Sequence, residues 1–92
     1  MPQVFKVGSY WIYFWSNEGD PLEYIHVHIS KGRPTQNATK VWITRSGKCL
    51  LCNNNSEIPS IALRNIMRTI EARSEVVVKK WQDYFGNVSY RL

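Results

Sequence analysis

The chain has 92 residues, of which 43% are hydrophobic and 13% aromatic, with a formal net charge of +5. This length allows a single domain, and the composition excludes a disordered tail and an acidic chain. Apolar runs stay well short of the roughly 18–20 residues of a membrane span. Neither a Walker loop nor a G-x-G-x-x-G or G-x-S-x-G motif is present, which disfavours large classes of nucleotide-dependent and hydrolytic enzymes.

The first half of the chain predicts antiparallel strands. Short apolar-rich or alternating segments are separated by turn residues such as Gly8-Ser9 and Ser46-Gly47. In one of them Ile25, Val27 and Ile29 alternate with polar residues, as in a half-buried strand. We expect strands over residues 4–7, 10–15, 24–30, 39–45 and 48–52.

The second half predicts two helices, because apolar residues recur there at helical spacing. The first stripe is Leu63, Ile66, Met67 and Ile70, and the second is Val77, Val78, Trp81, Tyr84 and Phe85. Ser74 is expected to cap the second helix, and Gly86 to end it.

Together these elements predict an α+β fold. An antiparallel β-meander of about four to five strands is followed by two helices packed on one face of the sheet. We expect one domain over residues 1–86 and a C-terminal tail over residues 87–92, where alternating apolar residues would also allow a short edge strand.

Several motifs resemble a known family. The segment Phe-Trp-Ser-Asn-Glu-Gly-Asp-Pro at residues 14–21 is followed by His26-Val27-His28, and Tyr84-Phe85-Gly86 closes the helical part. Over roughly residues 1–86 this order resembles the small bacterial family catalogued as domain of unknown function 4160. The resemblance implies no particular activity, but it implies a small protein partner encoded nearby, in a two-gene module of toxin–antitoxin type.

The two histidines are the sharpest candidates for chemistry. His26 and His28 lie two residues apart on a predicted strand, so both imidazoles share one face. Glu18, Asp20 and Glu23 in the preceding loop could orient or join them, either in a metal site or beside a general base for RNA cleavage. We favour a polar sheet face in which one histidine bonds the acidic loop, because strand alternation alone explains the pattern.

Two cysteines, Cys49 and Cys52, have the spacing of half a zinc site. A structural zinc site needs four ligands, which only His26 and His28 could complete. Residues three apart on a strand face opposite ways, so we expect small, reduced core residues instead. The sequence therefore predicts no metal and no cofactor.

A basic segment carries the remaining candidates. Residues 24–56 contain no acidic residue and five basic ones. Within this segment, we expect Trp42 to be the exposed aromatic side chain. For strand 10–15, aromatic on both faces, we favour burial in the core over an exposed base-stacking platform. Basic and aromatic side chains together suit a phosphate backbone or an acidic protein. The candidate binding residues are Trp42, Lys31, Arg33, Lys40, Glu18 and Asp20.

The leading expectation is a cytoplasmic, non-enzymatic binding module that engages a small protein partner or RNA through its sheet face, without a membrane partner. The alternative is a metal-independent, ribonuclease-like toxin. In it His26 or His28 would be the general base, and Arg33 or Lys40 would steady the phosphate. A metal-carrying structural domain is a third hypothesis. The sequence leaves open whether the chain forms a homo-oligomer.

Overall fold

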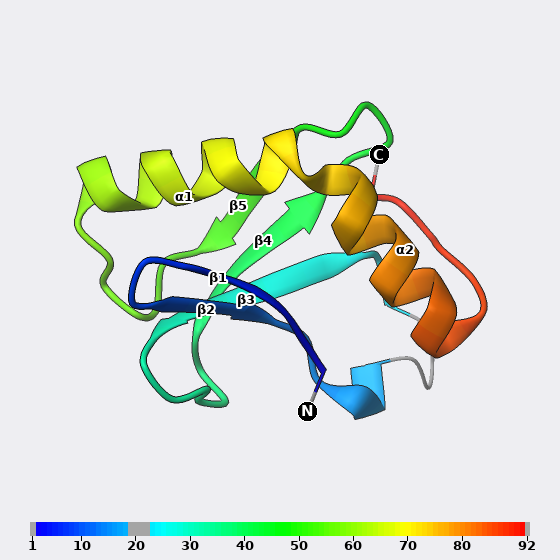
Figure 1. The fold of residues 1–92 in the computed structure, drawn as a ribbon, viewed down its shortest axis with the longest axis horizontal. Coiled ribbons are helices and arrows are strands. Elements are labelled where there is room, and N and C mark those ends of the chain that lie inside the picture. Colours follow the sequence, from blue (N-terminus) through cyan, green and yellow to red (C-terminus); the bar gives the residue numbers. More distant parts are fainter. Residues whose placement is uncertain (1, 19–22, 92) are drawn as a thin grey trace.

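The computed structural model describes residues 2–18 and 23–91 (Figure 1). Its strands are β1 (Gln3–Val7), β2 (Tyr10–Tyr13), β3 (His26–Lys31), β4 (Thr39–Ile43) and β5 (Cys49–Asn53). A single 3-10 turn, η1 (Ser16–Glu18), follows β2, and the helices α1 (Ser60–Ala72) and α2 (Ser74–Phe85) end the domain.

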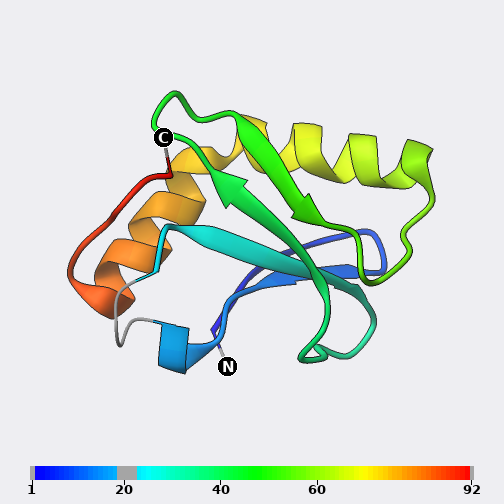
Figure 2. The ribbon, with the colours of Figure 1, turned by 180° about the vertical axis from the view of Figure 1, so that it is seen from behind.

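All five strands pair antiparallel in the order β1-β2-β3-β4-β5, which is a meander. The helices lie on one face of this sheet, as Figures 1 and 2 show from opposite sides. The predicted α+β architecture is therefore confirmed. No helix among the residues that the structure describes has the length and apolar character needed to cross a membrane.

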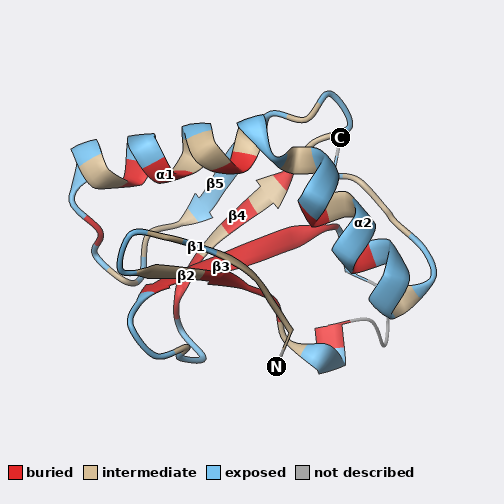
Figure 3. Ribbon diagram, in the orientation of Figure 1, coloured by how far each residue is buried: buried red, intermediate tan, exposed pale blue. Residues whose placement is uncertain are grey.

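The core lies between the sheet and the helices. Strand alternation sends Ile12, Val27 and Val41 toward the helices, where they join Ile66 and Ile70 in one buried cluster. Figure 3 shows the consequence: β3 is buried along almost its whole length, whereas the outward sides of both helices are exposed.

The structure ends β2 at Tyr13 and starts β3 at His26, so both strands are shorter than predicted. After β2 the chain leaves the sheet, and the Glu18 N–H closes a turn on the Trp15 carbonyl at 3.2 Å. The residue before β3 contacts the C-terminal tail, because the Ile25 N–H donates to the Ser89 carbonyl at 2.8 Å. The tail therefore packs on the domain.

The sequence predicts the C-terminal end of α2 correctly but not its N-terminal end. Gly86 ends α2 in the left-handed conformation, with φ of 83°, as glycine at this position permits. The predicted cap at Ser74 is wrong. Only Arg73 separates the helices, and its N–H still bonds the carbonyls of Thr69 and Ile70 in α1, so α2 starts without a side-chain cap.

Candidate functional site

The sheet face opposite the core residues Val27 and Val41 carries four of the predicted site residues, His26, His28, Lys40 and Trp42, and we call it the outer face. Trp42 and Lys40 alternate with the core residue Val41 and therefore point to this face. The register places His26 opposite Trp42, and His28 opposite both Lys40 and Tyr13. The outer face therefore gathers side chains from β2, β3 and β4.

Glu18 brings the two histidines together. Its Oε2 lies 2.6 Å from His26 Nε2 and 2.9 Å from His28 Nε2, and its Oε1 accepts the Trp15 N–H at 2.6 Å. We expected one histidine to bond the acidic loop, but the structure has both on one carboxylate oxygen. Figure 2 shows why this is possible: η1, which carries Glu18, lies at the end of the sheet where β3 begins. We call Glu18, His26 and His28 the Glu–His–His cluster.

This cluster is buried, a feature that the expectation of a polar sheet face did not include. His26 is fully buried, His28 is 7% exposed and Glu18 is 9% exposed. Burial by itself would raise the pKa of Glu18, but the hydrogen bonds from His26 and His28 outweigh it and hold that pKa well below its ordinary value. Glu18 is therefore ionised at neutral pH.

Each imidazole is positioned by further contacts. His26 Nδ1 lies 2.8 Å from the Tyr24 carbonyl, and its ring packs against the buried Trp81 of α2 at 5.2 Å between centroids. The ring of His28 packs on Tyr13 at 5.6 Å, and its Nδ1 is buried without a hydrogen bond to any described residue. The cluster is thus held by both the sheet and α2.

Beside the cluster lies a partly exposed group of side chains, Lys40, Trp42, Leu50 and Arg91, which we call the Trp42 patch. Lys40 Nζ and Arg91 Cζ lie 5.8 and 4.3 Å from the centre of the Trp42 ring. Leu50 is paired with Trp42 across β4 and β5 and is 39% exposed. Leu50 and Arg91 are not among the residues predicted from the sequence. The alternation in the tail allows an edge strand but does not indicate that Arg91 would contact Trp42.

Two other basic candidates do not join this patch. Lys31 and Arg33 are exposed. Lys31 is the last residue of β3 and Arg33 follows it, at the end of the strand opposite His26. Among the acidic candidates, Glu23 forms an ion pair with Lys40, with 3.4 Å between Glu23 Oε1 and Lys40 Nζ. Asp20 lies outside the described residues.

The cysteines are not brought to the histidines. Cys49 Sγ lies 3.6 Å from the Met67 carbonyl of α1, whereas Cys52 is exposed. Burial, with a smaller contribution from Glu71, raises the pKa of Cys49 to about 12. The thiol of Cys49 therefore stays protonated, and a Cys2His2 site does not form.

Comparison with known proteins identifies the family. A family model described as "Domain of unknown function (DUF4160)" matches residues 9–82. The chain belongs to this family. Neither the curated proteins nor the solved structures contain a significant match. The matched part of this DUF4160 chain includes the whole Glu–His–His cluster and Trp42, and it stops before Arg91.

Proposed function

We propose that this DUF4160 chain is a non-enzymatic binding module whose Trp42 patch engages a small acidic protein. In this proposal the partner is the second product of a two-gene module of toxin–antitoxin type. The supporting observation is the composition of the patch, in which an indole ring flanked by two cations lies beside an exposed leucine. Trp and Arg are the side chains that most often dominate binding energy at protein interfaces.

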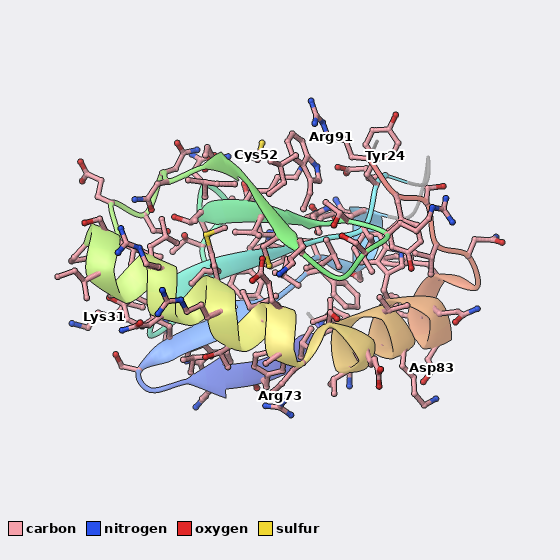
Figure 4. All side chains as sticks on the ribbon, turned by 90° about the horizontal axis from the view of Figure 1, so that it is seen from above. Tyr24, Lys31, Cys52, Arg73, Asp83 and Arg91 are labelled. Carbon is pink, nitrogen blue, oxygen red and sulfur yellow. The ribbon has the colours of Figure 1, made fainter. Side chains whose placement is uncertain are left out.

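Further exposed side chains near the Trp42 patch enlarge the surface that a partner could contact. Tyr24 is 51% exposed, and Figure 4 shows Tyr24, Cys52 and Arg91 projecting from one side of the molecule. These residues come from the β2–β3 connection, β5 and the tail, so one partner surface could contact all three segments. An aromatic and aliphatic centre with a polar rim is the usual anatomy of such an interface.

The charge of the patch favours an acidic partner. Lys40 and Arg91 contribute two positive charges. Among the described residues, Lys40 Nζ lies 3.4 Å from the Glu23 Oε1, whose side chain is exposed. An acidic protein surface would complement these charges and accelerate association. RNA would exploit the same side chains, but its detection is an outcome of the test below.

The geometry gives less support to the ribonuclease-like alternative. A general base must come within hydrogen-bond distance of the substrate hydroxyl whose proton it removes. The Nε2 atoms of His26 and His28 both face Glu18 instead, and the two rings are buried.

The test is co-purification of the tag-bearing chain with its neighbouring gene product, compared between two double variants. Lys40→Ala/Arg91→Ala removes two charges from the Trp42 patch. The matched control, Arg64→Ala/Arg68→Ala, removes two exposed charges from α1, on the other side of the sheet. We expect the wild type and the control to retain an equimolar small protein, and the patch variant to lose most of it.

The eluate is also examined for nucleic acid by its absorbance. Equal retention by the two double variants would contradict the proposed surface. RNA in place of a protein would contradict the proposed partner. Melting curves of both variants establish that a loss of binding is not a loss of folding.

A further inference from the structure

The Glu–His–His cluster has a geometry that the binding proposal does not use. Three potential ligand atoms, one each from Glu18, His26 and His28, all lie within 4.8 Å of one another. They come from two elements, η1 and β3, that meet at one end of the sheet. Among the described residues, this is the group of His, Cys, Asp and Glu side chains whose ligand atoms lie close enough together to hold one metal ion.

The hydrogen bonds of His26 leave a place for a proton or a metal ion between its ring and Glu18. A backbone carbonyl only accepts hydrogen bonds, so His26 Nδ1, 2.8 Å from the Tyr24 carbonyl oxygen, carries a hydrogen. In the neutral imidazole Nε2 then carries a lone pair, and this lone pair faces the ionised Glu18 carboxylate at 2.6 Å. Two acceptors repel at this distance unless a proton or a metal ion lies between them.

A metal ion could replace the hydrogens between the two rings and the carboxylate. His26 Nε2 and His28 Nε2 lie 2.6 and 2.9 Å from the same Glu18 oxygen, so one ion could contact all three side chains. Ligand atoms in a tetrahedral zinc site lie roughly 3.3 Å apart, given Zn–N and Zn–O bonds of about 2.0–2.2 Å. Withdrawal of the carboxylate by less than about 1 Å would therefore open the space for the ion.

The atoms around the cluster suit metal ligands. A histidine that binds a metal usually donates its other ring N–H to a carbonyl or carboxylate, as His26 does to Tyr24. Glu18 is oriented in the same way, because its Oε1 accepts the Trp15 N–H. Two imidazoles with one carboxylate are a ligand set of known zinc sites that leave a fourth position open.

We propose that Glu18, His26 and His28 bind one divalent zinc-like ion through Oε2 and the two Nε2 atoms. The ion would fix η1 to β3 at the end of the sheet. This inference does not depend on the proposed partner, because the Trp42 patch is formed by other side chains.

The test is calorimetric titration of tag-free, chelator-treated protein with zinc chloride. We expect the wild type to bind one equivalent, and Glu18→Gln and His28→Gln to bind at least about tenfold more weakly. The matched control, Cys49→Ser/Cys52→Ser, removes the thiols and is expected to bind as the wild type does. Absence of binding by the wild type would overturn the proposal, as would loss of binding in the cysteine variant alone.

A second measurement covers variants that fail to fold. Cobalt(II) is loaded into the wild type as a spectroscopic substitute for zinc. Ligation by nitrogen and oxygen gives weak visible bands only, whereas ligation by cysteine adds an intense charge-transfer band in the near ultraviolet. The weak bands alone are the expected result. The charge-transfer band, or the spectrum of free cobalt, would contradict the proposed ligands.

Discussion

Glu18→Ala is expected to lower the free energy of unfolding of the metal-free protein by roughly 3 kcal/mol, which corresponds to a fall in melting temperature of about 15 °C for a chain of this size. The substitution removes the acceptor of three hydrogen bonds, from Trp15, His26 and His28, in a buried place. The buried donors that remain carry most of the cost. Thermal and urea unfolding in the presence of a chelator measure the effect.

The control is Glu18→Gln, which keeps the shape and removes the charge. Since the folded protein holds the pKa of Glu18 below its ordinary value, ionised Glu18 stabilises the fold above a pH of about 5. This contribution is lost as the pH falls below about 4.3 toward the lowered pKa. The stability difference between wild type and Glu18→Gln should therefore be full at pH 7 and shrink toward pH 3. A difference independent of pH would contradict the charged cluster.

The second large effect is expected at Trp81, where alanine should cost about 4 kcal/mol. The Trp81 side chain is fully buried. The centre of its ring lies 5.0 Å from that of Phe14, 4.5 Å from that of Phe85 and 5.2 Å from that of His26. Truncation to alanine leaves a cavity at the centre of this aromatic group and removes the support of His26. The free energy of unfolding in urea measures the cost.

Trp81→Phe separates ring packing from the indole N–H. The Trp81 Nε1 is buried without a hydrogen bond to any described residue, so phenylalanine removes an unpaired donor along with some volume. We expect a cost below about 1.5 kcal/mol for this variant. Equal costs for phenylalanine and alanine would show instead that the N–H makes an essential interaction.

Periodicity explains how much of the fold the sequence predicts. Alternation in residues 24–30 and the helical stripe of Leu63, Ile66 and Ile70 each identify a buried face, and the structure packs these two faces together. The same alternation correctly places His26 and His28 on one side of their strand. It cannot give their burial, because that depends on where η1, a segment without periodicity, places Glu18 at the end of the sheet.

The Glu–His–His cluster and the Trp42 patch both rest on such contacts. Glu18 reaches His28 across ten residues, and Arg91 reaches Trp42 from a tail that the sequence predicts to lie outside the domain. Packing also overrides local chemistry at Ser74. Serine is a common helix cap, but only Arg73 separates the two nearly continuous helices, and α2 starts without a side-chain cap. Tertiary packing decides each of these features.

The most direct measurement of the binding surface is a nuclear magnetic resonance titration of the isotope-labelled chain with the unlabelled partner protein. We expect the amide signals of residues 40–42, Leu50 and Arg91 to shift or broaden first, while those around Arg64 and Arg68 on α1 stay in place. Changes concentrated on α1, with the Trp42 patch unaffected, would contradict the proposed binding surface.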